Sequence, residues 1–417
     1  MARTALARSL LRQRPSHLIS QSCFRSKTAS CRSYATTLAA EDVSDPKLRK
    51  LDTSALSVQK TTTPKEIIPN EELVFGRHFT DHMLTIEWTA SEGWMDPRIT
   101  PYQNFSLDPA TCVFHYAFTC FEGLKAYKDK QGNVRLFRPD KNMARVNRSA
   151  ARIALPNFEG DKMIELLKKF VKQDERFVPS TRGYSLYLRP TLIGTQRTLG
   201  VGPPGSALFY CIASPVGPYY PTGFKAISLE ATTYAVRAWP GGVGNAKLGA
   251  NYAPCIVPQM QAAKRGFHQN LWLFTEDGNE YVTEVGTMNL FTAWVAEDGV
   301  KELITAPLDG MVLEGVMRDS VLELARERLV PEGWRVSERK FTMKEIDKAA
   351  SEGRMLEVFG SGTAAVVSPV RNIGWRGKMI DCGLEPGKEA GPIAQKMWDW
   401  LAEIQYGEVE HPWSWKI

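Results

Sequence analysis

Residues 237–257 read RAWPGGVGNAKLGANYAPCIV and hold a single lysine, Lys247, among four glycines. Glycine adopts backbone conformations closed to other residues and lets a ligand come close to the main chain. A lysine partly buried in such a turn loses hydration, which favours the uncharged and nucleophilic amine. An amine of this kind can form a Schiff base with a carbonyl compound.

Two other interpretations of this stretch compete with the Schiff-base lysine. A phosphate-binding loop needs Ser or Thr directly after its Gly-Lys pair. Here Ala246 precedes Lys247 and Leu248 follows it, so that interpretation is rejected. A surface turn with a solvated lysine fits the same residues, and this stretch alone leaves it open beside the Schiff-base lysine.

Three further stretches decide between them: VTEVGTMNLF (282–291), LDGMVLEGVMR (308–318) and FGSGTAAVVSP (359–369). Together with KLGANY (247–252), they resemble the fold-type-IV pyridoxal-phosphate enzymes, and specifically the branched-chain amino acid aminotransferases. The resemblance runs from about Trp88 to the C-terminus. Several separated motifs in the right order make it far more specific than any one motif.

The resemblance implies roles for the residues around the cofactor ring. Lys247 would bind pyridoxal 5′-phosphate covalently and would also move the proton between the substrate Cα and the cofactor C4′. Glu284 would keep the pyridine nitrogen protonated and so strengthen the electron sink. Tyr252 would donate a hydrogen bond to the ring hydroxyl oxygen, and Thr287 would support the side of the ring.

The cofactor phosphate needs a cation and main-chain donors. The resemblance assigns these to the amides of Val316 and Met317, at the start of an apolar-periodic helix, and to Arg145. Relatives usually read Asn-Met-Asp-Arg around that arginine, so Ala144 departs from the pattern. Thr363 is expected to contact the cofactor as well as the substrate.

Tyr187 and Arg189 alternate with leucines in YSLYLRP, so both side chains should lie on one face of a strand. In the resembling enzymes, this tyrosine contacts the substrate α-carboxylate and this arginine the distal carboxylate of glutamate. The turn at Thr363 and Ala364 gives main-chain amides to the α-carboxylate. By the same resemblance, four further residues would form an apolar wall of the substrate pocket. They are Tyr116, Phe121, Val201 and Tyr219.

The formal charge of +6 is unevenly distributed along the 417 residues. Residues 1–40 hold seven basic side chains and no acidic one, whereas the remainder holds 45 basic and 46 acidic residues. A nucleic-acid partner is therefore not expected. The leader is typical of a transit peptide for the mitochondrial matrix, and its apolar runs are too short for a membrane span.

Seven cysteines are present, and their spacing fits neither a disulfide framework nor a zinc site, so no metal is expected. Animal members of the family often carry a Cys-x-x-Cys pair after the GSGTA turn. Here Ala365 and Ser368 occupy those two positions. The sequence therefore predicts an enzyme that lacks the family's redox-sensitive pair.

Periodicity and turn signals divide the chain into five parts. These are a transit peptide (1–40), an arm or linker (41–72), a small α/β domain (73–213), an interdomain loop (214–224) and a large cofactor-binding domain (225–417). The expected fold class is α+β. The resemblance implies a two-domain fold like that of D-amino acid aminotransferase, with the cofactor in the cleft between the domains.

The same patterns predict individual elements. Helices are expected at 140–153, 161–173, 252–265, 318–328 and 390–404. Strands are expected at 82–88, 184–192, 207–213, 270–274, 281–283, 290–295 and 356–359, with a hairpin formed by 116–127 and 133–137.

The resemblance implies a homodimeric enzyme that moves amino groups between Leu, Ile or Val and 2-oxoglutarate by a ping-pong mechanism. Two alternatives remain within fold type IV: a D-amino acid aminotransferase and an aminodeoxychorismate lyase. Tyr187, Arg189 and the C-terminal sequence DWLAEIQYG (399–407) argue against both. An inactive scaffold is a third alternative, and the intact Lys247 and Glu284 argue against it.

Overall fold

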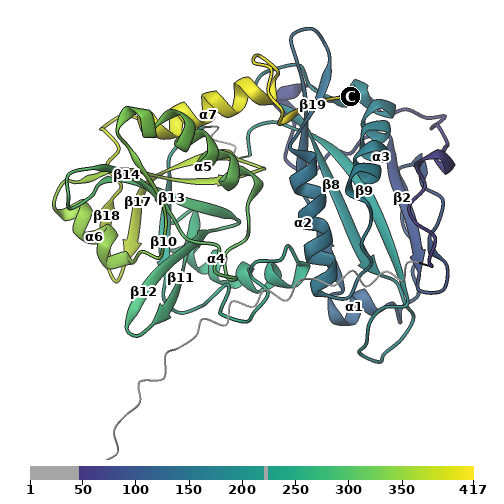
Figure 1. Ribbon diagram of the computed structural model, residues 1–417, viewed down its shortest axis with the longest axis horizontal. Helices are drawn as coiled ribbons and strands as arrows, with labels where there is room; N and C mark the ends of the chain where they lie inside the picture. The colour runs from purple at the N-terminus through teal and green to yellow at the C-terminus, as the bar shows by residue number, and fades with distance from the viewer. Residues whose placement is uncertain (1–46, 220–223) are drawn as a thin grey trace, which may run out of the picture. The chain divides into compact units, whose positions relative to one another are not determined.

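The computed structural model describes residues 47–219 and 224–417. The expected transit peptide at 1–40 lies outside the described residues. Two β-sheets with helices packed on them make up the described chain, which confirms the α+β class (Figure 1). Within these residues, no helix combines the length and apolarity that a membrane crossing requires.

The first sheet has the order β1-β4-β2-β9-β8-β6-β7-β19, with β3 beside β2 and β5 beside β8. Its long central pair, β8 and β9, is antiparallel, with Tyr187 opposite Ser214 and Arg189 opposite Ile212. Its strands are β1 (Ser57–Val58), β2 (His82–Thr89), β3 (Gly93–Trp94), β4 (Arg98–Pro101), β5 (Thr119–Phe121), β6 (Leu124–Lys128), β7 (Val134–Phe137), β8 (Ser185–Gly194), β9 (Ser206–Val216) and β19 (Ser414–Lys416).

Helices α2 (Pro139–Arg152) and α3 (Gly160–Gln173) pack on this first sheet (Figure 1). The apolar residues of α3 recur at helical spacing, and all six that the sequence pattern places on one face are buried. These are Met163, Ile164, Leu166, Leu167, Phe170 and Val171. Burial of this face fixes α3 on the sheet, and α2 packs beside it.

The strand expected over residues 116–127 is interrupted in the structure. Helix α1 (Cys112–Tyr116) ends at Ala117, which has a left-handed φ of 54°. Two short strands follow, β5 and β6, and both pair with β8. The break between them falls at Glu122, whose N–H donates to Pro190 O at 2.7 Å and whose carboxylate is fully buried. The interruption thus places a charged side chain in the interior.

The described part of the expected arm has fixed contacts with the first sheet. β1 pairs in parallel with β4, and Leu51 lies in the core of the sheet. The Thr61 N–H donates to His82 Nε2 at 2.9 Å, while His82 Nδ1 lies 2.6 Å from Asp174 Oδ1. Both ring nitrogens of this buried histidine therefore have protein partners. The pattern of polar residues in the arm did not indicate these contacts.

The second sheet has the order β12-β11-β10-β17-β16-β13-β14-β15, with β18 beside β17. β12 also pairs with β13, so the strands from β12 to β13 in this order form a closed ring. Its strands are β10 (Ile227–Thr232), β11 (Gln269–Glu276), β12 (Asn279–Val285), β13 (Met288–Val295), β14 (Lys301–Thr305), β15 (Arg335–Glu338), β16 (Met355–Gly362), β17 (Val366–Trp375) and β18 (Lys378–Asp381).

Each face of the second sheet has its own core. Side chains alternate between the faces of a strand, so Val358 and Phe359 on β16 enter different clusters. Phe359 packs with residues of α5 (Val316–Arg328) and α7 (Pro392–Gln405). Val358 packs with residues of α6 (Met343–Ser351). The remaining helix, α4 (Ile256–Lys264), lies against β11 and follows the turn that holds Lys247.

The chain passes from the first sheet to the second between Val216 and Ile227, near the expected interdomain loop. It also returns. After α7, the short strand β19 pairs antiparallel with β7, so Ser414–Lys416 belong to the first sheet. The sequence division assigned all of 225–417 to the second domain. The return depends on aromatic packing, because Trp413 and Trp415 contact the two cores, and no strand periodicity marks so short an element.

Candidate active site

A cavity of about 430 Å³ lies among residues from both sheets. Its size falls within the range of roughly 300–1,000 Å³ that is usual for small-molecule sites. The sequence-predicted site residues that line it are Arg145, Tyr187, Arg189, Tyr219, Lys247, Tyr252, Thr287, Val316, Met317, Thr363, Ala364 and Phe121. The fold thus brings together residues that are far apart in the sequence.

The main chain of Lys247 is fixed by contacts with the first sheet and its helix. Its N–H donates to Ser149 Oγ at 2.9 Å, and its carbonyl accepts from the N–H of Phe121 at 3.1 Å. A Cβ on Gly244 would collide with the Met311 carbonyl, so only glycine allows this close approach. Gly244 therefore allows the turn to pack closely against the segment at Met311.

The side chain of Lys247 is half-buried and reaches into the cavity. Its Nζ lies 3.3 Å from Tyr252 Oη and 5.0 Å from the ring centroid of Phe121. The rings of Phe121 and Tyr252 are themselves 4.8 Å apart. The amine therefore has one hydroxyl neighbour and an aromatic surface beside it, an arrangement that leaves it accessible to a ligand.

Glu284 is buried and does not line the cavity directly, but its partners Asn289 and Leu313 do. Oε1 accepts from Leu313 N–H at 3.3 Å and from Asn289 Nδ2 at 3.4 Å. Oε2 has Arg237 as its ion-pair partner, yet it accepts no hydrogen bond from the described residues. Burial raises the pKa of Glu284, and the charge of Arg237 opposes that rise. One carboxylate oxygen is thus left for a further donor.

Helix α5 begins at Val316, and Gly315 at its N-cap has no side chain to satisfy the first N–H groups. Val316 and Met317 both line the cavity. The first amides of a helix carry partial positive charge and have no partners within the helix, so they suit an anion.

Arg145 lies on α2 at the same end of the cavity, and its guanidinium is held in place by the protein. Its Nη1 donates to the Glu314 carbonyl at 2.9 Å, while Nε and Nη2 form a two-point contact with Glu122. Burial raises the pKa of Glu122, but the charge and hydrogen bonds of Arg145 outweigh it and the pKa is lowered. The pair is therefore ionised and fixes the arginine beside the N-terminus of α5.

Tyr187 and Arg189 lie together on β8 and line the cavity. Arg189 Nη2 donates to Tyr187 Oη at 3.1 Å, and the guanidinium carbon lies 4.8 Å from the centroid of Phe121. Arg189 Nε is buried and has no hydrogen-bond partner among the described residues. A Cβ on Gly123 would collide with the Tyr187 hydroxyl. Glycine at that position therefore makes room for the tyrosine, and the arginine keeps an unused donor.

Thr363, Ala364 and Ala365 form the turn between β16 and β17, and all three line the cavity. Among the described residues, no acceptor is found for the N–H groups of these three residues. Three adjacent main-chain donors at a cavity wall suit a carboxylate.

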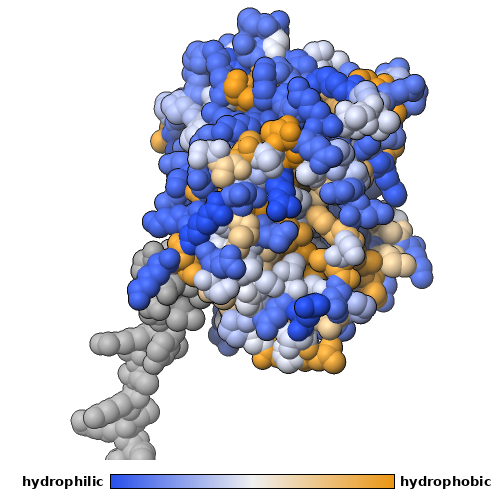
Figure 2. All heavy atoms as spheres, turned by 90° about the vertical axis from the view of Figure 1, so that its right-hand side faces the viewer, coloured by the Kyte–Doolittle hydropathy of each residue, from blue (hydrophilic) through white to orange (hydrophobic). Residues whose placement is uncertain are grey.

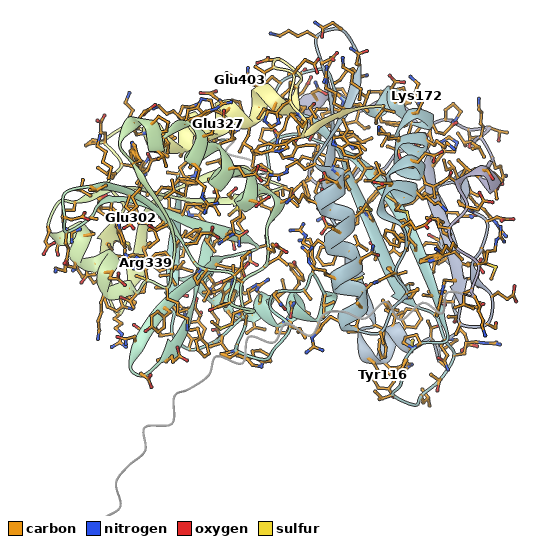
Figure 3. The ribbon with its side chains drawn as sticks, viewed as in Figure 1. Tyr116, Lys172, Glu302, Glu327, Arg339 and Glu403 are labelled. Carbon is orange, nitrogen blue, oxygen red and sulfur yellow. The ribbon has the colours of Figure 1, made fainter. Side chains whose placement is uncertain are left out.

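Two residues expected in the apolar wall lie elsewhere. Val201 is 76% exposed, in the loop between β8 and β9. Tyr116 lies at the end of α1 (Figure 3) and is 38% exposed. Its hydroxyl donates to the Leu199 carbonyl. Neither residue lines the cavity of this chain, and their place in the apolar wall stays a prediction. The early end of α1 directs Tyr116 toward the β8–β9 loop instead.

The sequence analysis missed four residues that the structure places in or beside the site. Phe75 lines the cavity, and its ring centroid lies 4.9 Å from that of Tyr187. Glu122 and Arg237 pair with Arg145 and Glu284, respectively. Lys125 contacts the turn at Ala364. An acidic residue inside the apolar segment FEGLKAY was the one available signal, because buried charges need partners.

Residues 119–373 match the family described as amino-transferase class IV. The chain is 59% identical to the mitochondrial branched-chain-amino-acid aminotransferase of Saccharomyces cerevisiae, over 87% of this chain and 93% of that protein. It is 57% identical to the cytosolic enzyme of the same organism, over 88% and 98%. The chain belongs to the class IV aminotransferases, and among them to the branched-chain-amino-acid aminotransferases.

A solved structure agrees with this assignment. The T.th. branched-chain amino acid aminotransferase with pyridoxamine 5′-phosphate has a TM-score of 0.60 and 26% identity. It covers 79% of this chain and 97% of its own. The chain is therefore an aminotransferase of branched-chain amino acids and their oxo acids, and class IV aminotransferases depend on pyridoxal phosphate.

The residues of this cavity fit that cofactor. The Oε2 of Glu284 is ion-paired with Arg237 but accepts no hydrogen bond from the described residues, so it can accept one from a protonated ring nitrogen. The uncapped start of α5 can bind a phosphate. Lys247 contributes an amine with one hydroxyl neighbour, Tyr252. The cavity thus offers the cofactor a carboxylate, an amine, a phenol and a binding site for its phosphate.

Proposed function

We propose that this enzyme exchanges the amino group between Leu, Ile or Val and 2-oxoglutarate in two half-reactions at one cavity. The observation that carries the proposal is the position of Lys247. Its amine enters a cavity whose wall also holds Arg145, which is paired with Glu122, and the main-chain donors of the turn at Thr363, Ala364 and Ala365. A ping-pong sequence follows, because one substrate must leave before the other can occupy the same donors.

Pyridoxal phosphate, when bound, supplies the electron sink that makes the substrate Cα acidic. We assign Glu284 to the ring nitrogen, Tyr252 to the ring hydroxyl oxygen and Thr287 to the side of the ring. The amides of Val316 and Met317 with Arg145 would hold the phosphate, and Thr363 would contact both cofactor and substrate. Lys247 would bind the cofactor and carry the proton that leaves Cα.

Two kinds of side chain must enter the same cavity. Phe121 and Tyr219 would contact an aliphatic side chain, and Arg189 would meet the distal carboxylate of glutamate or 2-oxoglutarate. The unused Nε of Arg189 supports this assignment. Tyr187 and the amides of Thr363 and Ala364 would bind the α-carboxylate that all substrates share.

Two experiments test the proposal. Borohydride reduction followed by peptide mass spectrometry should place the pyridoxyl label on Lys247, and Lys247→Ala should abolish turnover. A panel of amino donors and oxo-acid acceptors should show activity with Leu, Ile, Val and 2-oxoglutarate. Label on another lysine, or a preference for D-amino acids, would contradict the proposal.

We also propose a homodimer. Several large apolar side chains of α1 and the β8–β9 loop are exposed: Phe114, Tyr116, Leu199 and Val201. The face in Figure 2 carries hydrophobic residues in its lower part, whereas its upper part is mostly hydrophilic. A second copy could cover such a surface. Light scattering on the purified enzyme tests this, and a monomer at micromolar concentration would contradict it.

The proposed location is the mitochondrial matrix. The support is the basic, acid-free segment 1–40 and the mitochondrial relative described above. A relative of similar identity is cytosolic, so the location needs an experimental test. Protein isolated from mitochondria should lack residues 1 to roughly 30–40. Recovery of Met1 on the organellar protein would argue against import by cleavage.

A further inference from the structure

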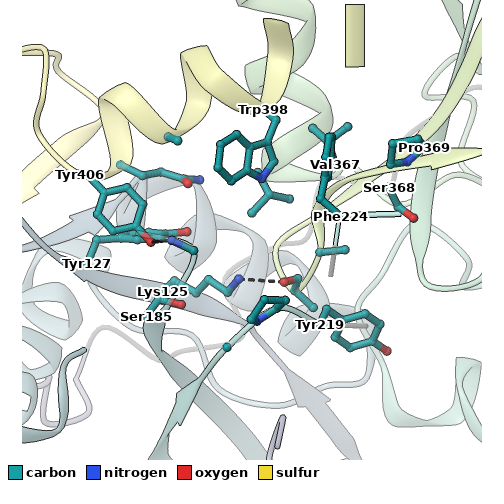
Figure 4. Close-up of a pocket in the computed structure, with 18 of the residues that line it drawn as sticks. Lys125, Tyr127, Ser185, Tyr219, Phe224, Val367, Ser368, Pro369, Trp398 and Tyr406 are labelled. Carbon is teal, nitrogen blue, oxygen red and sulfur yellow. Dashed lines mark hydrogen bonds between the residues drawn. The ribbon is translucent and has the colours of Figure 1, made fainter. Parts of the chain in front are cut away.

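A second, smaller cavity of about 100 Å³ lies behind the turn formed by Thr363, Ala364 and Ala365 (Figure 4). It shares Tyr219, Ala364 and Ala365 with the larger cavity, so the turn separates the two. Lys125 on β6 enters this rear cavity and is only 5% exposed. Its Nζ donates to the Ala364 carbonyl at 2.8 Å, the contact drawn as a dashed line in Figure 4.

The Ala364 carbonyl and the Ala365 N–H belong to one peptide group. No cis peptide bond is present in the described chain, and in a trans peptide these two groups point in opposite directions. A carbonyl that faces Lys125 in the rear cavity therefore directs the Ala365 N–H toward the larger cavity. The ammonium group also polarises the peptide, which makes that N–H a stronger donor.

The charge of Lys125 has no counter-charge among the described residues that line the rear cavity. The polar or titratable groups that face it are Tyr127 on its own strand, Ser185 and Tyr187 on β8, Ser368 on β17, Trp398, Gln405 and Tyr406 on α7, Tyr219 and Lys225. No carboxylate of the described residues lines the rear cavity, and burial lowers the pKa of Lys125 to about 7. A buried ammonium is costly unless an anion compensates it. A substrate carboxylate on the other side of the turn would provide that anion.

We propose that Lys125 is a positioning residue for the substrate α-carboxylate, acting through the Ala364–Ala365 peptide group. This inference rests on the proposed function of the larger cavity. It adds the Ala365 N–H as a third main-chain donor beside those of Thr363 and Ala364, and it adds Lys125 as the residue that orients this donor without touching substrate or cofactor. It also makes binding of the substrate depend on pH, because the protonated amine of Lys125 stabilises the bound carboxylate more than the neutral amine does.

The test compares leucine with leucinamide, which lacks the carboxylate, in single-turnover half-reactions of the holoenzyme. Lys125→Met should raise the KM for leucine about tenfold, the effect of one hydrogen bond to a charged group, and should leave leucinamide nearly unchanged. Lys125→Arg keeps a charge and should recover most of the loss. Lys128→Met, on the same strand but bonded to the Glu175 carbonyl, is the matched control and should behave as wild type.

A pH profile supplies a second readout. In the wild-type enzyme the KM for leucine should rise as the pH passes through the pKa of about 7 and Lys125 loses its proton. The profile of Lys125→Arg should be flat over that range. These two measurements need no Lys125→Met protein, so they remain decisive if that variant does not fold.

The outcomes separate the two proposals. Equal losses for leucine and leucinamide, or no loss for either, would overturn the role of Lys125 while wild-type transamination still stood. A wild-type enzyme that takes an amino group from neither compound would instead overturn the proposed function.

Discussion

The Nε of Arg145 lies 2.6 Å from Oε1 of Glu122, and its Nη2 lies 2.9 Å from Oε2 of the same carboxylate. Both side chains are buried, and Asn142 donates a further hydrogen bond to Oε2. The arginine expected to meet the cofactor phosphate is therefore already paired within the protein. A bound phosphate would add a second anion to this cation rather than supply its first.

This pairing predicts how Glu122→Gln should behave. Without cofactor, the variant leaves Arg145 buried with no counter-charge, which should lower the stability by about 3 kcal/mol. With cofactor, the phosphate restores a negative charge, so the loss should be smaller. Thermal unfolding of apo and holo forms measures both. The apo–holo gap in Tm should widen relative to wild type, and Glu175→Gln, a carboxylate paired with Lys172 outside the site, should leave the gap unchanged. A gap that stays constant in Glu122→Gln would contradict the prediction.

Arg189→Leu should slow the half-reaction with glutamate much more than the half-reaction with leucine. The variant loses the guanidinium expected to bind the distal carboxylate of glutamate. A hydrogen bond to a charged group contributes about 1.5–3 kcal/mol. The half-reaction with glutamate should slow about ten- to hundredfold, whereas that with leucine should change little. Stopped-flow absorbance follows each half-reaction separately. Arg197→Leu, an exposed arginine paired with Asp108, serves as control. Equal losses in both half-reactions would show that Arg189 is structural.

Mild peroxide should leave the enzyme largely active. All five described cysteines are free thiols, and burial raises the pKa of each, including Cys112 and Cys120. A redox switch requires an accessible thiol of low pKa with a resolving partner nearby, and Ala365 and Ser368 cannot supply the pair that animal relatives often carry. Activity is assayed on the mature protein after peroxide and again after dithiothreitol. A large loss that the thiol reverses would point to another pair, with Cys112 and Cys120 tested first.

Stability should fall as the pH rises through neutrality because of Glu357. Burial raises its pKa to about 7, although it accepts from the N–H groups of Ile393 and Ala394 at the start of α7. The folded state thus holds this proton more tightly than the unfolded state. The resulting stabilisation is complete below the unfolded-state pKa and decreases by about 2 kcal/mol between roughly pH 5.5 and pH 8.

Urea denaturation of wild type and Glu357→Gln across this range tests the assignment. The variant has no proton to lose, so its denaturation midpoint should depend less on pH than that of wild type. Glu352→Gln, an exposed carboxylate paired with Arg354, is the matched control. Parallel pH profiles for wild type and Glu357→Gln would assign the dependence to another group.

Periodic elements were predictable from the sequence because local pattern and burial agree in them. Helix α3 was expected at 161–173 and spans Gly160–Gln173, with every predicted apolar residue buried. Motif residues such as Lys247 and Thr363 line one cavity, as the resemblance implied. Their individual roles stay predictions, which the Lys247 and Arg189 variants test.

The contacts that the sequence did not reveal are those between segments far apart in the chain. Glu122 and Arg145 are 23 positions apart, and Lys125 and Ala364 are 239 apart, with no local pattern that links either pair. The sequence also did not reveal that Ala117, with its left-handed φ, ends α1 and that the Tyr116 hydroxyl donates to the Leu199 carbonyl. Backbone breaks of this kind depend on tertiary packing more than on residue propensity.

The pairing of β19 with β7 has a consequence for synthesis on the ribosome. Arg135, on β7, and Ser414, on β19, are 279 positions apart, so the edge of the first sheet stays unpaired while the whole second sheet is translated. An open strand edge is a template for pairing with other chains. The nascent polypeptide would therefore carry an unprotected edge until its last strand emerges, a period in which a chaperone could bind.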